Sequence, residues 1–319
     1  MSQPHPIIAV TGSSGAGTTA VATSFAAMFR RLDVKPAYVN GDAFFRYNRN
    51  DMQQAIDDAT ARGASVSHFG PEANLFEELE ALFRGYGENG TGRVRHYVKE
   101  DEQGAAFGVA PGEFTPWEAL PSDTDLLFYE GLHGGVAAHT WARRRSSPAH
   151  FPGANTERRK NAKGIDVAQH VDLLLGIVPA INLEWIQKIH RDCHRQGCSV
   201  EAVTETILRR MNDYVYYIVP QFAVSDINFQ RVPLVDTSNP FVAREVPTAD
   251  ESLIVIHFRE RRRHDLHALA ATIDGAFASR ANTLVIPGGK LSLALELICG
   301  PLIAEMLERR GRRRARRSG

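Results

Sequence analysis

A glycine-rich turn near the start of the chain has the residue types that bind phosphate. Gly12 and Gly17 have the spacing of a phosphate-binding loop, and the turn follows an apolar stretch. In such loops backbone N–H groups point at phosphate oxygens, and the dipole of the next helix adds positive potential. Thr18 holds the usual lysine position, so a glycine turn that binds no nucleotide remains an alternative. The residues of this predicted nucleotide loop are Gly12, Ser13, Ser14, Gly15, Ala16, Gly17, Thr18 and Thr19.

Oxygen ligands and a candidate base stand near this loop in the predicted fold. The Thr19 hydroxyl falls where loops of this class supply a Mg²⁺ ligand. Glu130 follows an apolar strand, as does the carboxylate that holds Mg²⁺ directly or through water in such proteins. Asp42 ends another predicted strand, and the carboxyl ends of parallel strands face the ligand crevice. A carboxylate there can take the proton of an attacking hydroxyl, although the local sequence also allows Asp42 to be a helix N-cap.

Cations are needed beside a transferring phosphoryl group, and two segments offer them. Arg46 and Arg49 follow Asp42 within about two helical turns, where they are either cations beside it or surface charges. Further along, Lys188, Arg191 and Asp192 share one face of a predicted helix by their i, i+3, i+4 spacing. A cation on this face could take the place of the missing loop lysine. Phosphoryl transfer depends on positioning and charge neutralisation more than on which segment supplies the charge. The alternative is an ordinary Lys188–Asp192 ion pair on a solvated helix.

A metal site on the same helix is the weaker interpretation. His190 and His194 lie four residues apart and could ligate one metal, with Cys193 and Cys198 nearby. No second ligand pair elsewhere in the sequence completes such a site.

The elements that must position these residues alternate between strands and helices. Short apolar strands separated by helices indicate an α/β fold, with a mostly parallel mixed sheet and helices on both faces. Strands are predicted over residues 7–10, 35–40, 125–129, 172–178, 231–235 and 252–258. Helices are predicted over 18–31, 183–195, 199–217 and 291–310, with Gly197 as a break. The whole chain is predicted to be one domain, with a loop insertion at about 139–164 and a solvated basic tail at about 309–319.

Composition and charge exclude several other classes of protein. The 319 residues are 43% hydrophobic and 23% charged, with Lys plus Arg equal to Asp plus Glu at 37 each. With a formal net charge of zero, the chain has no overall electrostatic potential that would attract nucleic acid or an anionic membrane. Nucleic-acid binding would rest only on the terminal arginines. No apolar run is long enough for a membrane span, and the first residues do not look like a secretory signal. Three cysteines form no disulfide framework, so a cytoplasmic location is predicted.

Long stretches of the sequence resemble bacterial phosphoribulokinases. The most specific are Asn-Leu-Glu-Trp-Ile-Gln-Lys-Ile-His-Arg-Asp at 182–192 and Asp-Ile-Asn-Phe-Gln-Arg-Val-Pro at 226–233. The likeness extends over essentially the whole chain, including residues 10–19, 41–44, 128–134, 207–211, 219–222 and 234–239. It implies a P-loop kinase that uses ATP and Mg²⁺ to convert D-ribulose 5-phosphate into ribulose 1,5-bisphosphate in the Calvin cycle. It also accounts for Thr18, because bacterial members share the Gly-Thr ending.

The resemblance implies a role for each matching residue. Asp42 corresponds to the general base, and Lys188 to the cation on the transferring phosphate. Glu130 and Asp192 correspond to the acidic groups that support Mg²⁺-ATP. The implied sugar-phosphate contacts are Arg49, Tyr97, Lys99 and Arg191.

Some positions depart from the family pattern, and others bear on regulation. Phe45 and Lys99 stand where the family tends to have His. Gln196 replaces an Arg that in the family generally precedes the glycine matching Gly197. These departures are expected to affect substrate affinity more than reaction class. The resemblance also implies a homo-octamer activated by NADH and inhibited by AMP, with Arg280 in a matching stretch as an effector contact.

Two other functions remain open at this point. A uridine or pantothenate kinase would share the nucleotide loop and the strand-end Asp42 but not the two long signatures. A nucleotide-binding regulator that has lost catalysis through the Phe45 and Lys99 changes would bind ATP without turnover.

Overall fold

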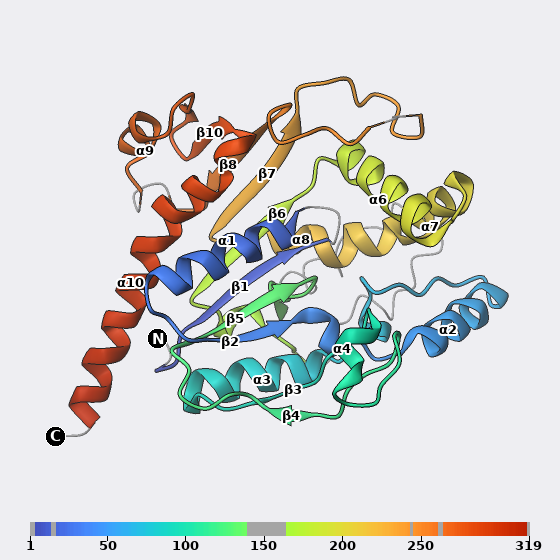
Figure 1. Ribbon diagram of the computed structural model, residues 1–319, viewed down its shortest axis with the longest axis horizontal. Coiled ribbons are helices and arrows are strands. Elements are labelled where there is room, and N and C mark those ends of the chain that lie inside the picture. The colour runs from blue at the N-terminus through green and yellow to red at the C-terminus, as the bar shows by residue number, and fades with distance from the viewer. Residues whose placement is uncertain (1–3, 14–16, 139–163, 243–244, 261–263, 318–319) are drawn as a thin grey trace. The chain divides into compact units, whose positions relative to one another are not determined.

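The computed structural model describes residues 4–13, 17–138, 164–242, 245–260 and 264–317 (Figure 1). Within these residues an eight-stranded sheet has the order β2-β5-β1-β6-β7-β8-β10-β9. β2 is parallel to β5 and β6 to β7, whereas β7, β8, β10 and β9 are joined by antiparallel pairs. The predicted α/β fold with a mostly parallel mixed sheet is confirmed. The strands are β1 (Ile7–Gly12), β2 (Pro36–Asn40), β5 (Leu126–Gly131), β6 (Leu173–Val178), β7 (Ile227–Pro233), β8 (Ser252–Phe258), β9 (Phe277–Arg280) and β10 (Thr283–Pro287).

Helices connect these strands, and two strands of two residues each form a small separate antiparallel sheet. β3 (Arg93–Val94) and β4 (Glu118–Ala119) pair in an antiparallel manner. The helices are α1 (Thr18–Arg31), α2 (Arg49–Ala61), α3 (Phe76–Asn89), α4 (Asp101–Ala105), α6 (Ile181–Gln196), α7 (Val200–Asp213), α8 (Val219–Phe222), α9 (Leu266–Thr272) and α10 (Leu291–Arg317). Among the described residues, none of the helices combines the length and the hydropathy that crossing a membrane requires.

The chain folds as two compact units, each built from separated segments. The first unit comprises residues 1–9, 35–172 and 209–224. Its core contains the rings of Phe83, Tyr86 and Tyr129, which are fully buried. Phe83 and Tyr129 pack edge to face at 5.3 Å, and the Tyr86 hydroxyl shares a 2.8 Å hydrogen bond with Thr124. Burial of large aromatic side chains supplies much of the stability of such a core.

The second unit comprises residues 10–34, 173–208 and 225–319. In it α1 packs against α10, as Figure 1 shows where the blue and red helices meet. Phe25 on α1 is fully buried, whereas Arg31 forms a 2.8 Å ion pair with Glu296 at the surface. This packing holds the helix that follows the nucleotide loop.

The observed boundaries confirm some predictions and correct others. The helix predicted over 18–31 and the strand predicted over 252–258 occur with those bounds. The strand predicted over 231–235 is instead β7, which begins at Ile227 because that residue pairs with both Leu175 and Phe258. The helix predicted to end at Arg310 continues to Arg317, through the segment predicted as a basic tail. The predicted insertion lies almost entirely in residues 139–163, outside the described part of the chain.

The helix predicted over 199–217 changes geometry before its end. α7 stops at Asp213, and a π-helical turn over Tyr214–Ile218 leads into α8. Pro220, which has no N–H to donate, lies in the first turn of α8, directly after the π-helical turn.

Candidate active site

The predicted nucleotide loop lies between a buried strand and a helix, as expected. β1 ends at Gly12, where a Cβ atom would lie only 2.7 Å from the Ile177 carbonyl oxygen. Gly17 has a φ of 98° and precedes α1, in a backbone conformation that favours glycine. Both glycines are therefore required by the backbone. Ser14, Gly15 and Ala16 lie outside the described residues, as does the Thr19 side chain.

A buried contact that the sequence did not reveal joins this loop to α6. The Ser13 side chain is 2% exposed, and its hydroxyl donates a hydrogen bond to the Glu184 carboxylate. Burial raises the pKa of Glu184, whereas the bond from Ser13 and the charges of Lys188 and Arg191 lower it. The two partners are 171 residues apart in the chain, so no local pattern signals the contact.

The predicted charged face of α6 is present as a tight cluster. The Asp192 side chain accepts hydrogen bonds from the Lys188 ammonium and, at 2.9 Å, from the Arg191 Nε. Burial alone would raise the pKa of Asp192, but these bonds from two cations bring it below its usual range. The carboxylate is therefore ionised at neutral pH. The Lys188–Asp192 ion pair also exists, but Asp192 is only 6% exposed, so the pair is not on a solvated helix.

In the first unit, Asp42 lies in a short 3₁₀ turn, Gly41–Phe44, directly after β2. The Asn40 side chain accepts a 2.9 Å hydrogen bond from the Asp42 N–H, so Asn40 is the N-cap of the turn. The alternative that Asp42 is itself a helix N-cap is therefore wrong. The Asp42 carboxylate forms a 2.6 Å ion pair with the Lys99 ammonium. The turn thus presents a carboxylate next to a cation.

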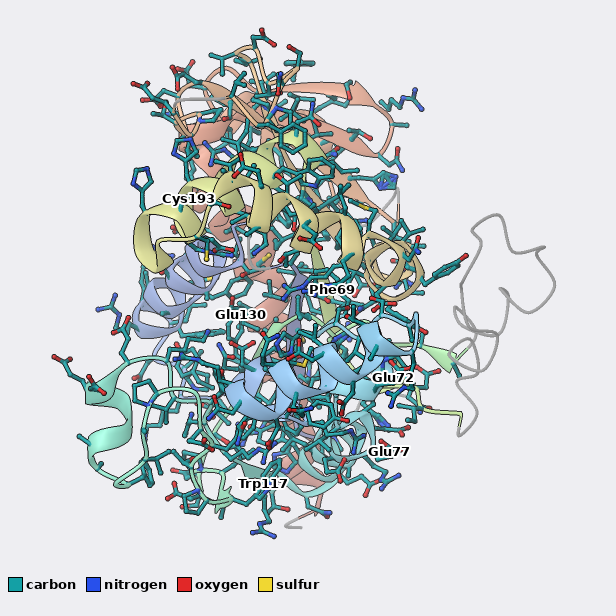
Figure 2. All side chains as sticks on the ribbon, turned by 90° about the vertical axis from the view of Figure 1, so that its right-hand side faces the viewer. Phe69, Glu72, Glu77, Trp117, Glu130 and Cys193 are labelled. Atoms are coloured by element: carbon teal, nitrogen blue, oxygen red, sulfur yellow. The ribbon has the colours of Figure 1, made fainter. Side chains whose placement is uncertain are left out.

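Glu130 lies close to this turn, at the end of the neighbouring strand. β2 and β5 are parallel, and Glu130 is the register partner of Asn40. Glu130, labelled in Figure 2, is partly buried. The preceding residue, Tyr129, has a hydroxyl whose pKa is raised above its usual value, chiefly by burial. The charges of Asp42 and Glu130 raise this pKa further, whereas the hydrogen bond from the His133 N–H lowers it. Asp42 thus comes directly after β2, as the sequence predicts, whereas Glu130 is the last residue but one of the neighbouring strand β5.

A hollow of about 440 Å³ opens beside the Asp42 turn. Two residues predicted to contact the sugar phosphate, Tyr97 and Lys99, contribute to its wall. Its lining residues are Asn40, Ala43, Arg95, His96, Tyr97, Lys99 and Phe107. A third predicted contact, Arg49, begins α2 and donates its backbone N–H to the Gly112 carbonyl oxygen. The hollow places aromatic and cationic groups next to a carboxylate, which suits a phosphorylated polyol.

The residues around Phe45 stabilise the far side of the same turn. The Phe45 ring is 8% exposed, stacks on His68 at 4.2 Å and meets the Tyr97 ring edge-on at 6.1 Å. The Arg46 guanidinium donates to the carbonyl oxygens of Glu72 and Asn74 at 3.0 and 2.9 Å. Arg46 is exposed, in agreement with the alternative of a surface charge, and it also ties two backbone segments together.

Two neighbouring histidines carry neutral imidazoles: His133 is buried, and His68 is partly buried against the Phe45 ring. Burial lowers the pKa of both His68 and His133 to about 4, so both are neutral at pH 7. The His133 Nε2 lies 3.0 Å from the His68 carbonyl oxygen, and a carbonyl only accepts, so this nitrogen carries the proton. The Nδ1 of the same ring faces the Gln221 amide at 3.5 Å.

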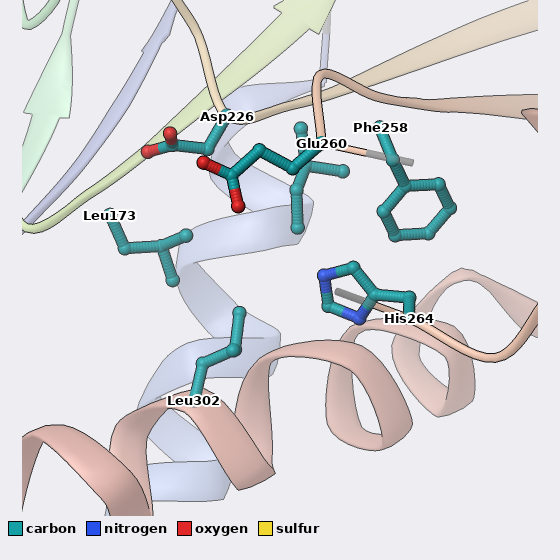
Figure 3. Close-up of a pocket in the computed structure, with 7 residues that line it drawn as sticks. Leu173, Asp226, Phe258, Glu260, His264 and Leu302 are labelled. Atoms are coloured by element: carbon teal, nitrogen blue, oxygen red, sulfur yellow. The ribbon is translucent and has the colours of Figure 1, made fainter. Parts of the chain in front are cut away.

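A second pocket, in the other unit, is unrelated to the predicted site (Figure 3). The Asp226 carboxylate accepts the Leu174 N–H at 2.8 Å and pairs with Arg259. The residues that line this pocket are Leu173, Asp226, Ile227, Phe258, Glu260, His264 and Leu302. None of them is a predicted site residue. Arg280, the predicted effector contact, is exposed on β9.

Comparisons with known proteins give one consistent result. The model of the phosphoribulokinase/uridine kinase family matches residues 7–238. A phosphoribulokinase from Nitrobacter vulgaris is 52% identical, over 98% of this chain and 100% of its own length. The chromosomal phosphoribulokinase of Cupriavidus necator is also 52% identical, over 98% of this chain and 99% of its own. The solved structure of phosphoribulokinase from Rhodobacter spheroides is 50% identical, with a TM-score of 0.82 over 97% of this chain and 99% of that one.

Proposed function

Because the chain belongs to the phosphoribulokinase/uridine kinase family, we propose that it transfers the γ-phosphoryl group of ATP to D-ribulose 5-phosphate. The products are ADP and ribulose 1,5-bisphosphate, the acceptor of carbon dioxide in the Calvin cycle. The observation that carries this proposal is the full-length similarity to proteins named phosphoribulokinase. The chain is accordingly a phosphotransferase that acts on an alcohol.

Asp42 is the proposed general base. It takes the proton of the C1 hydroxyl while that oxygen attacks the γ-phosphorus, and the bond from phosphorus to the β,γ-bridging oxygen breaks. ADP leaves with the electron pair of the broken bond. The ion pair with Lys99 supports this role, because it holds the Asp42 carboxylate in one position beside a cation.

The nucleotide enters as its magnesium complex, which is a substrate of the reaction. Glu130, Asp192 and the Thr19 hydroxyl are the proposed oxygen ligands, a donor set that suits Mg²⁺. Lys188 is the proposed cation on the transferring phosphoryl group. Its present partner, Asp192, is ionised and buried, so the cluster already keeps a carboxylate and an ammonium in a low-dielectric environment.

The sugar phosphate is proposed to bind through cations and one phenol. Tyr97 and Lys99 line the hollow beside the Asp42 turn, which supports their assignment. Arg49 and Arg191 are assigned on the resemblance alone. Arg280 as an effector contact, activation by NADH, inhibition by AMP, a homo-octamer and a cytoplasmic location are likewise proposals that follow from the family.

A panel of acceptors tests the proposed substrate. ADP release from Mg²⁺-ATP is measured with ribulose 5-phosphate, uridine or pantothenate, with a no-acceptor control. We expect turnover that depends on the pentose phosphate alone, since the hollow offers cations for its phosphate. Turnover on uridine and none on ribulose 5-phosphate would assign the chain to another branch of the family. ATP binding with background turnover on every acceptor would identify a regulator instead.

A further inference from the structure

We infer that Arg95 is a positioning residue for the reaction, because its guanidinium clamps the turn that carries Asp42. This inference rests on the proposed role of Asp42 as the base. Arg95 acts through the backbone on either side of Phe44, and it does so from a segment far along the chain.

Two hydrogen bonds make the clamp. The Arg95 Nε donates to the Ala43 carbonyl oxygen at 2.9 Å, and its Nη2 donates to the Phe45 carbonyl oxygen at 2.5 Å. These carbonyls belong to the first and the third residue after Asp42, so one planar group fixes the orientation of the turn that follows the carboxylate. The fork of a guanidinium suits this task, because its donors have a fixed geometry that an ammonium lacks.

Aromatic rings hold the guanidinium itself in place. Its central carbon lies 3.6 Å from the centre of the Phe114 ring and 4.9 Å from that of Trp117 (labelled in Figure 2). Trp117 in turn meets Phe44 edge-on at 5.8 Å. Cation–π contacts of this kind restrict a long side chain to one position. The clamp therefore has a rigid support on the side away from the turn.

The segment that carries Arg95 also supplies the partner of Asp42. Lys99 follows four residues later, and the residues between them are tied to the strand-like stretch 112–115. The His96 carbonyl accepts from Thr115 at 2.9 Å, and Val98 exchanges backbone hydrogen bonds with Glu113 and Gly112 at 2.9 and 2.8 Å. Arg95 and Lys99 thus set the backbone and the side chain of Asp42 from one rigid segment.

Loss of the clamp is expected to loosen the turn without unfolding it. Two other ties remain, from the Asn40 cap and from Arg46 to the carbonyls of Glu72 and Asn74. A base that is displaced by about 1 Å can lose about 10²-fold in rate. The expected defect is therefore in kcat.

The test compares Arg95→Met and Arg95→Lys with the parent enzyme. We expect kcat to fall about 10²-fold for Arg95→Met and about 10-fold for Arg95→Lys, which keeps the charge but not the fork. The KM for ATP is expected to stay within about 2-fold, because ATP binding does not depend on the base. Arg93→Met is the matched control: Arg93 is exposed on β3, and its guanidinium donates to Trp117 rather than to the Asp42 turn. Thermal unfolding verifies that each variant folds. If Arg95→Met does not fold, the kcat of Arg95→Lys tests the inference.

A double-mutant cycle separates positioning from other roles. If Arg95 acts through Asp42, Arg95→Met lowers kcat by less than about 3-fold in an Asp42→Asn background, because the two changes remove the same contribution. Full additivity would overturn the inference, as would a higher KM for ribulose 5-phosphate at unchanged kcat, which indicates direct substrate contact. An active parent whose Arg95→Met variant keeps full kcat overturns this inference alone. A parent that is inactive on ribulose 5-phosphate overturns the proposed function as well.

Discussion

At the scale of single residues, the Asp42 turn shows how neighbours assign a carboxylate its role. Asn40 takes over the capping of the turn, which leaves the Asp42 carboxylate to pair with Lys99. Lys99 is one of the departures from the family pattern, yet it keeps a cation 2.6 Å from the proposed base. This departure therefore changes the kind of cation without removing it.

Phe45 is the departure with a predicted consequence for substrate affinity. Its ring packs between His68 and Tyr97, and Tyr97 lines the hollow. We expect Phe45→His to lower the KM for ribulose 5-phosphate about 3- to 10-fold, the effect of one added hydrogen bond. Steady-state kinetics measure it, with Phe45→Leu as the control that keeps an apolar side chain. An unchanged KM would show that position 45 makes no polar contact with the sugar.

At the scale of elements, α6 connects the nucleotide loop to the charged cluster. Glu184 in its first turn accepts the Ser13 hydroxyl, and Lys188 and Asp192 follow on the same helix. We expect Glu184→Ala to raise the KM and Kd for ATP about 10- to 100-fold, since a buried hydrogen bond to a charged group contributes about 1.5–3 kcal/mol.

The control for this prediction is Glu184→Gln, which keeps an acceptor oxygen for Ser13. We expect Glu184→Gln to bind ATP within about 3-fold of the parent, because a neutral acceptor retains part of the interaction. Isothermal titration of the nucleotide measures both variants. If Glu184→Ala bound ATP as tightly as the parent, the tie between the loop and α6 would have no role in nucleotide binding.

Elements with strong local patterns could be predicted from the sequence. α1 and β8 have the predicted bounds because one is amphipathic between a glycine turn and Leu32, and the other is a β-branched apolar run. The β9–β10 hairpin could not be predicted, because its connection, Ala281-Asn282, lacks the glycine that marks a two-residue hairpin turn. The Arg95 clamp and the Ser13–Glu184 contact have no local signal, since their partners meet only in the fold.

The candidate site was predicted in its residue types rather than in its contacts. Asp42, Glu130 and the Lys188–Asp192 pair were identified because strand ends and helix faces have a regular spacing. The hydrogen bonds from Arg46 to distant backbone carbonyl groups could not be predicted, because such contacts follow no periodicity in the sequence. Spacing reveals which groups share an element, whereas their partners depend on tertiary packing.

At the scale of the whole molecule, buried imidazoles make the stability of the fold depend on pH. His68 and His133 have a pKa lowered from 6.5 to about 4. The unfolded chain therefore binds more protons than the folded one between these values. The stabilisation is fully present above pH 6.5 and is lost as pH falls toward 4.

We therefore expect the free energy of unfolding to be lower at pH 5 than at pH 7, by about 2 kcal/mol for each buried imidazole. Denaturant unfolding at both pH values measures the difference. His133→Gln should reduce it by about half, whereas His267→Gln, which removes an exposed histidine, should leave it unchanged. Equal stability of the parent at pH 5 and pH 7 would contradict the burial of neutral imidazoles.

The central claim concerns a phosphoryl transfer that Asp42 assists as the base. A single-turnover experiment tests it most directly: excess enzyme is mixed with Mg²⁺-ATP labelled at the γ-phosphate and with ribulose 5-phosphate, and the labelled bisphosphate is counted over time. We expect the parent to convert the label fully into ribulose 1,5-bisphosphate, and Asp42→Asn to bind ATP normally but transfer about 10²- to 10⁴-fold more slowly. No labelled bisphosphate from the parent, or equal rates for both proteins, would contradict the claim.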